Sequence, residues 1–159
     1  MIDRPHLELS EYLPYLINRV GSALVAGYEG ELARHHLSIA MWRVLAALST
    51  NGKQRQIDIA EMTAIDVSTM SRLVTRLIRA GLVSRVRSDT NNREVTVELT
   101  PKGRTLMNRL ILLARKLERA AVAGVSAADL AVTRDSLRRM YHNIAADSAT
   151  PARRKTKAG

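Results

Sequence analysis

The sequence predicts a mainly α-helical fold that contains one small β-hairpin. Apolar residues recur every three or four positions in six segments, which is the spacing of amphipathic helices. Two short segments rich in β-branched residues flank a run of turn-forming residues after the fourth helical segment, and this pattern predicts a hairpin. The expected order of elements is therefore α-α-α-α-β-β-α-α.

The first two helices are expected over Tyr12–Glu29 and Ser38–Ser49. Pro14 suits the first turn of its helix, where the missing N–H costs least. The apolar stripe of the first helix comprises Leu13, Leu16, Ile17, Val20 and Leu24. Ser38 is the expected N-cap of the second helix, and Asn51-Gly52 predicts its end. The buried stripe of the second helix is expected to comprise Met41, Val44, Leu45 and Leu48.

A short helix over Arg55–Met62, a tight turn and a longer helix over Val67–Ala80 follow. Asp66 is the expected N-cap of the longer helix and Gly81 the residue just beyond its end, because a short polar side chain favours the first position and glycine the second. One face of the longer helix is apolar on a helical wheel. Its members are Val67, Met70, Leu73, Val74, Leu77 and Ile78.

The strands of the hairpin are expected over Val83–Arg87 and Glu94–Leu99. Thr100-Pro101 then predicts the start of a helix, since threonine is a favoured N-cap and proline a favoured first residue. This helix is expected to end near Ala121. A sequence that resembles a capping box precedes the last helix, which is expected over Ala127–Ala145.

The charge balance is unusual, with 25 Lys and Arg residues against 15 acidic residues and a formal net charge of +10. Such a chain attracts polyanions, chiefly nucleic acid or an anionic membrane surface. The lack of cysteine excludes disulfides, thiol redox sensing and cysteine-ligated zinc. No apolar run is long enough to span a membrane and Met1–Pro14 lacks a signal-peptide core, so we expect a cytoplasmic protein with no membrane partner.

The polar face of the Val67–Ala80 helix is the expected DNA-binding surface. It carries small hydroxyl groups and arginines but no acid, so the helix fits deep in the major groove while arginine contacts guanine or phosphate. The candidate contacts on this helix are Ser68, Thr69, Ser71, Arg72, Thr75 and Arg76. The alternative is a surface helix whose basic face is simply solvated. The short helix before it and the hairpin after it favour a winged helix-turn-helix.

The hairpin is the expected wing. Six arginines and one acid lie between Val67 and Arg93, and a long cation at a hairpin tip fits the narrow, electronegative minor groove. The candidate DNA contacts in the wing are Arg87, Asn91, Asn92 and Arg93. The alternative is an ordinary polar hairpin turn.

Three ordered motifs resemble the MarR family of transcriptional regulators: Gly81-Leu-Val-Ser-Arg-Val-Arg87, Asn91-Asn-Arg93 and Leu99-Thr-Pro-Lys-Gly103. Leu37–Leu48 and Val125–Asn143 are also similar to the family's second and last helices, so the resemblance covers about residues 10–146. It implies a homodimer with two recognition helices in successive major grooves of a pseudo-palindromic operator, most often acting as a repressor. It also implies that Arg93 enters the minor groove, although Asn91 and Asn92 replace a usual aspartate and a frequent arginine.

The helices at the two chain ends are expected to form the dimer. They carry broader apolar stripes than a monomer of this size needs, although the same stripes would also cover a monomeric core. We therefore expect dimerisation helices in residues 1–37 and 101–146, and a winged helix-turn-helix DNA-binding domain in residues 38–100. Residues 147–159 are expected to form a basic, disordered tail.

The resemblance further implies release from DNA by a small anionic, often aromatic, effector or a CoA thioester. The candidate effector-binding residues are Tyr15, Arg19, His36, Trp42 and Arg43. Tyr15 and Arg19 are four positions apart, so a ring and a cation share one helix face. The alternative is that the rings belong to the core and the cations pair with acids.

No catalytic residue, cofactor or metal site is predicted. The sequence lacks phosphate-loop, dinucleotide-binding, nucleophile-elbow and zinc-protease motifs, so we do not expect an enzyme. The adjacent His35 and His36 point apart on a helix and rarely hold one metal ion together. A non-specific architectural nucleic-acid-binding protein is the remaining alternative, but such a protein needs only charge and not a face rich in Ser and Thr.

Overall fold

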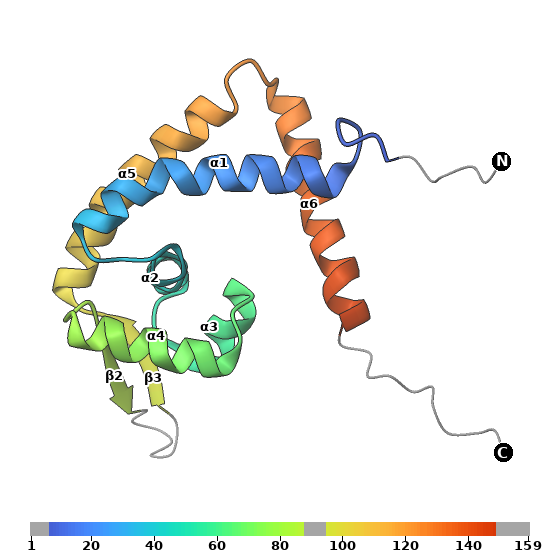
Figure 1. Cartoon of the computed structure of the whole chain (residues 1–159). Helices are drawn as coiled ribbons and strands as arrows, with labels where there is room; N and C mark the ends of the chain where they lie inside the picture. The colour runs from blue at the N-terminus through green and yellow to red at the C-terminus, as the bar shows by residue number, and fades with distance from the viewer. Residues whose placement is uncertain (1–6, 88–94, 149–159) are drawn as a thin grey trace, which may run out of the picture. The chain divides into compact units, whose positions relative to one another are not determined.

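The computed structural model describes residues 7–87 and 95–148 of the chain. It divides into two compact units, Met1–Glu118 and Arg119–Gly159. The elements in chain order are α1 (Leu13–Arg34), α2 (Ile39–Asn51), β1 (Gln54–Arg55), α3 (Gln56–Thr63), α4 (Val67–Arg79), β2 (Val83–Arg87), β3 (Val95–Leu99), α5 (Pro101–Ala121) and α6 (Ala127–Ser148) (Figure 1). This order confirms the predicted winged helix-turn-helix, with β1 as an additional strand.

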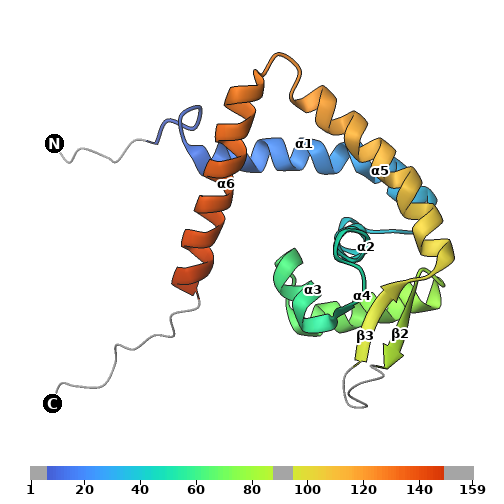
Figure 2. The same ribbon diagram turned by 180° about the vertical axis from the view of Figure 1, so that it is seen from behind.

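The centre of the first unit is α2. It lies between α1 on one side and α4 on the other in both views (Figure 1 and Figure 2). Ser38 caps the helix as predicted, because its hydroxyl accepts a hydrogen bond from the Met41 N–H at 3.2 Å. The predicted buried stripe is confirmed for all four members: Met41, Val44, Leu45 and Leu48.

Helix α1 ends at Arg34 and is therefore longer than predicted. The sequence places Gly30 near the expected end, but glycine inside a helix costs only about 1 kcal/mol. Leu32 lies beyond that glycine and is buried in the core, and its packing extends the helix. Four of the five members of the predicted stripe are exposed in this chain: Leu13, Leu16, Ile17 and Val20. The fifth, Leu24, is half-buried.

A tight turn joins α3 to α4. Ala64 has the left-handed backbone conformation (φ +53°), and the Ile65 N–H donates to the Ala60 carbonyl at 3.1 Å, which closes the end of α3. Asp66 then caps α4 as predicted, since its carboxylate accepts from the Thr69 N–H at 2.8 Å. The turn fixes the direction in which α4 leaves α3.

The apolar face of α4 packs into the core of the first unit. Its buried residues are Met70, Leu73, Val74 and Leu77, as predicted. Val67, predicted on the same apolar face, remains 55% exposed, because the core-facing part of α4 begins only at Met70. Ile78, also predicted on this face, is half-buried and packs against the core.

The sheet has three antiparallel strands in the order β1-β3-β2. The two hairpin strands pair from Val83 opposite Leu99 to Arg87 opposite Val95. On its other side β3 pairs with β1, where Gln54 lies opposite Val97. The sequence does not reveal β1, because its two polar residues form a strand only through this long-range pairing. Val97, in the central strand, is fully buried.

The start of α5 packs against the turn after α4 and is hydrogen-bonded to it. The Thr100 hydroxyl donates to the Gly81 carbonyl at 2.7 Å and accepts from the Gly103 N–H at 3.0 Å, so it caps α5 as predicted. Gly103 faces the backbone of Leu82 with no room for a side chain, since a Cβ there would lie 2.0 Å from the Leu82 carbonyl oxygen. Glycine is therefore required at this crossing.

The second unit contains α6, which Ser126 caps through its hydroxyl. The Ser126 hydroxyl donates to Asp129 Oδ2 at 2.7 Å and accepts from the Asp129 N–H at 3.1 Å. The helix ends at Ser148, three residues beyond the predicted end, and the rest of the expected tail lies outside the described residues. Among the described helices of both units, none combines the length and the apolar character that crossing a bilayer requires.

Candidate nucleic-acid interface

The polar face of α4 is the candidate nucleic-acid interface, on the side of the helix opposite its buried residues. Of the six residues predicted to contact DNA there, four are exposed: Ser68, Ser71, Arg72 and Arg76. Thr69 and Thr75 are half-buried. The Thr75 hydroxyl donates to the Ser71 carbonyl at 2.9 Å, so its proton is already engaged within the helix.

Further arginines extend this basic surface beyond the predicted contacts. Arg79 follows Arg72 and Arg76 at helical spacing, and Arg85 precedes Arg87 by two positions on β2; all five are exposed. Within the described part of the chain, no carboxylate forms an ion pair with any of them. The DNA contacts predicted from the sequence do not include Arg79 and Arg85, although helical spacing places Arg79 on the polar face of α4. The arrangement provides positive charge that is available to phosphate.

The base of the wing is formed by the paired ends of β2 and β3. Arg87, a predicted contact, is exposed and lies opposite Val95. The other three predicted wing contacts, Asn91, Asn92 and Arg93, lie outside the described residues. Their contact with the minor groove remains a prediction.

The N-terminus of α4 is organised by Asp66. Its Oδ1 accepts from the Ser68 hydroxyl at 2.6 Å and from the Thr69 N–H at 2.8 Å. These two hydrogen bonds, with a smaller contribution from the Arg72 guanidinium, hold the pKa of Asp66 well below its ordinary value. The cap therefore orients Ser68, one of the predicted DNA contacts, before any DNA is bound.

We expect Asp66→Asn to make stability less dependent on pH in acid. The pKa of Asp66 is lower in the folded state than in the unfolded chain, where it is about 3.9. The ionised carboxylate therefore stabilises the fold fully at pH values above about 3.9. This contribution is lost as the pH falls below about 3.9 toward the folded-state pKa. Asparagine keeps an acceptor for the cap but does not titrate. Thermal unfolding of both proteins at several pH values measures the effect. The wild type should be the more stable protein near neutral pH, and a difference that stays constant down to about pH 2 would contradict the assignment.

The five predicted effector residues fall into separate places. Tyr15 and Arg19 form a cation–π pair on α1, with the guanidinium carbon 5.6 Å from the ring centroid. Trp42 and Arg43 line a cavity of about 510 Å³ between α2 and α3. His36 is exposed in the turn after α1 and has a positive φ of 54°. The structure therefore brings together two pairs and leaves His36 apart from both.

Tyr28 is an aromatic neighbour of Trp42 that sequence reasoning missed. The two ring centroids are 5.6 Å apart and the rings are tilted by 30°. Burial, and then the negative charge of Glu118, raises the pKa of the Tyr28 phenol above its ordinary value. The sequence offers no local signal for this contact, because the two residues lie on different helices.

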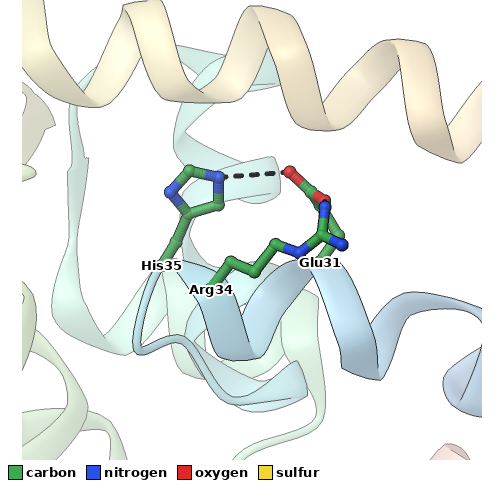
Figure 3. A network of polar contacts seen from close by, with 3 residues as sticks. All are labelled: Glu31, Arg34 and His35. Atoms are coloured by element: carbon green, nitrogen blue, oxygen red, sulfur yellow. Dashed lines mark hydrogen bonds and ion pairs between the residues drawn. The ribbon is translucent and has the colours of Figure 1, made fainter.

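His35 and His36 do not act as a pair. His35 Nε2 lies 3.3 Å from Glu31 Oε1, and Arg34 Nη1 lies 3.1 Å from Glu31 Oε2, so both side chains contact one carboxylate (Figure 3). Residues 7–87 and 95–148 contain no cluster of three or more His, Asp or Glu side chains arranged to hold a metal ion.

Comparisons of the sequence and of the fold with known proteins agree on one family. The model of the MarR family matches residues 37–95, which include α2 to β2 and the start of β3. The fold is similar to that of a MarR family transcriptional regulator from Silicibacter pomeroyi, with 30% sequence identity, a TM-score of 0.79, and coverage of 88% of this chain and 97% of the other.

Two further relatives resemble most of the chain. BpsR from Bordetella bronchiseptica, whose DNA binding is regulated by 6-hydroxynicotinic acid, is 27% identical with a TM-score of 0.74, over 86% of this chain and 98% of BpsR. The HTH-type transcriptional repressor NicR from Pseudomonas putida is 24% identical over 139 residues, which are 87% of this chain and 88% of NicR.

Proposed function

Since the chain belongs to the MarR family of transcriptional regulators, we propose that it is a repressor that binds a pseudo-palindromic operator as a homodimer and is released by a small anionic effector. Family membership makes it a DNA-binding regulator and not an enzyme. The observation that carries the proposal is the face of α4, where exposed serines and arginines lie opposite a fully packed core.

The side chains on the polar face of α4 favour sequence-specific DNA binding over binding to phosphate charge alone. Arginine can form two hydrogen bonds to guanine, and a small hydroxyl allows the helix backbone to approach the bases. Ser68 and Ser71 provide such hydroxyls beside Arg72 on one helix. A surface adapted only to phosphate needs no small side chains between its cations.

The homodimer is supported by apolar faces that remain exposed in the single chain. On α1 the exposed residues are Leu13, Leu16, Ile17 and Val20. On α6 the exposed residues that share one side of the helix, at spacings of three and four positions, are Leu137, Tyr141 and Ile144. Contiguous exposed apolar surface of this kind is typical of interfaces. Two recognition helices in one dimer would then contact half-sites about one helical turn apart, or a multiple of it.

We expect Val20→Glu to dissociate the dimer. Burying an uncompensated carboxylate in an apolar interface costs roughly 3–5 kcal/mol, and Val20 is 58% exposed in the single chain, so its own fold should survive. Sedimentation velocity over a range of concentrations measures the change. Ser22→Glu is the matched control, because Ser22 is exposed on the same helix but two positions away, on another side. A fully dimeric Val20→Glu protein would place the interface elsewhere.

The proposed effector is an aromatic acid or its CoA thioester. The regulation of BpsR by 6-hydroxynicotinic acid supports the class of ligand. Trp42 and Arg43 supply a ring and a cation in one cavity, which suits an aromatic anion. Tyr15, Arg19 and His36 remain candidates that do not line this cavity.

The deciding experiment selects operators from random duplex DNA and compares the selected site with a scrambled duplex at physiological salt. A specific regulator should prefer the selected site by about 1,000-fold or more, whereas an architectural protein shows almost no preference. Aromatic acids and CoA thioesters are then tested for release of the selected duplex, with Trp42 fluorescence as the binding signal. No preference between the duplexes would overturn the proposed function.

A further inference from the structure

Val67, the first residue of α4, presents an apolar side chain beside the candidate nucleic-acid interface. It is 55% exposed, although helical periodicity groups it with residues of the core. We propose that Val67 contacts the C5-methyl group of a thymine in the major groove, and so selects thymine at one position of each half-site. This inference deepens the proposed function and rests on it, because it names a base that α4 recognises.

Helical spacing places Val67 on the same edge of α4 as two small side chains of the interface. Ser71 follows it by four residues and Thr75 by eight, so the three lie in one row along the helix. Arg72 and Arg76 form a second row, about 100° further around the helix axis. The interface therefore has a cationic edge, suited to phosphate or guanine, and a separate edge of small or apolar side chains.

The position of Val67 is fixed before DNA binds, because hydrogen bonds hold the backbone on both sides of it. Before it, the Ile65 N–H donates to the Ala60 carbonyl at 3.1 Å. After it, the Met70 N–H donates to the Asp66 carbonyl at 2.8 Å. A valine side chain in a helix also has one strongly preferred rotamer. Contact with DNA therefore orders little that is free in the unbound protein, and the entropy cost is small.

The chemistry of this surface selects thymine among the groups that DNA presents. In the major groove all four bases offer hydrogen-bond donors or acceptors, and only thymine adds a methyl group. Valine has neither donor nor acceptor, so a polar base edge placed against it would lose water without gaining a partner. Against a methyl group, two apolar surfaces leave water together, which favours binding.

Phosphate is disfavoured as the group that approaches Val67. The preceding residue, Asp66, carries an ionised carboxylate that accepts from the Ser68 hydroxyl at 2.6 Å and from the Thr69 N–H at 2.8 Å. A phosphate beside this carboxylate would meet a like charge, whereas a thymine methyl is neutral. The apolar side chain and the adjacent acid thus both direct this end of α4 toward base edges.

The test replaces the thymines of the selected operator one at a time by deoxyuridine, which lacks only the C5-methyl group. Binding of each duplex by the full-length protein is measured at one salt concentration. For the wild type, one such replacement in each half-site should weaken binding by about fourfold, the effect of one methyl-sized group that no longer leaves water. Val67→Ala should bind the original and the replaced duplex with equal affinity, because the valine methyls that make the contact are gone.

Two further variants separate a thymine contact from a general effect of apolar surface. Val67→Ile keeps a branched apolar side chain and should retain the preference for the methyl group. Ile57→Ala is the matched control, because Ile57 is 49% exposed on the neighbouring helix α3, and this variant should respond to deoxyuridine as the wild type does. Val67 is exposed and alanine favours helices, so Val67→Ala should keep its fold, which thermal unfolding checks.

Three results would overturn the inference: no thymine whose methyl group affects binding, a Val67→Ala protein that keeps the wild-type preference, or loss of that preference in Ile57→Ala. The same assay compares the selected duplex with the scrambled one. A protein that prefers the selected duplex but ignores the methyl groups would reject only the thymine contact. A protein with no preference between these duplexes would reject the proposed function, and this inference with it.

Discussion

Gly103→Ala should be among the most destabilising single substitutions in the protein, at about 3 kcal/mol or more. An alanine Cβ would lie 2.0 Å from the Leu82 carbonyl oxygen and 3.0 Å from its carbon. Both are backbone atoms, so α5 must move away from the turn after α4, and overpacking against rigid structure is costly. Such a shift would also strain the Thr100 cap, which joins the same two segments.

Gly30→Ala provides the matched control for this prediction. Gly30 also lies within a helix, but an added Cβ there meets nothing within 4 Å. Alanine is the better helix former by about 1 kcal/mol, so this variant should be slightly more stable than the wild type. Urea unfolding of the three proteins compares their free energies. A Gly103→Ala protein within 1 kcal/mol of the wild type would mean that the crossing of α5 over Leu82 is more open than described.

Arg72→Ala and Arg76→Ala should each weaken operator binding without lowering the free energy of unfolding appreciably. Both side chains are exposed and have no carboxylate ion pair within the described residues, so folding loses little. An arginine that contacts a base should cost about 1–3 kcal/mol and relax specificity at one position. An arginine that contacts phosphate should weaken all duplexes alike and lower the salt dependence of binding.

The control for the arginine variants is Arg115→Ala, which removes the same charge from an exposed position on α5. Binding of the selected and scrambled duplexes is measured for each protein at two salt concentrations. If neither α4 variant differs from Arg115→Ala, α4 is not the helix that contacts the bases.

The local features of the fold could be predicted because they depend on neighbours in sequence. The four buried residues of α2 follow from helical periodicity, and the caps Ser38, Asp66 and Thr100 follow from side chains that bond within three residues. The strand β1 could not be predicted, because its pairing partner is more than 40 residues away in sequence. The true end of α1 and the exposure of Val67 depend equally on tertiary packing.

The candidate sites were predictable to different degrees for the same reason. The polar face of α4 lies on one helix, so its period alone separates Arg72 and Arg76 from the core. The cavity beside Trp42 is completed by Met62 and Thr63 of α3, so the periodicity of one helix does not predict it. The ring contact between Tyr28 and Trp42 also arises only when α1 packs on α2.

The exposed apolar faces of α1 and α6 would link the stability of the protein to its concentration if a second copy covers them. If a second copy covers those faces, association and folding share one equilibrium, and the midpoint of thermal unfolding rises with protein concentration. A chain diluted below the dissociation constant would lose part of its resistance to unfolding and to proteolysis. The level of the regulator in the cell would then set its lifetime as well as the occupancy of its operator.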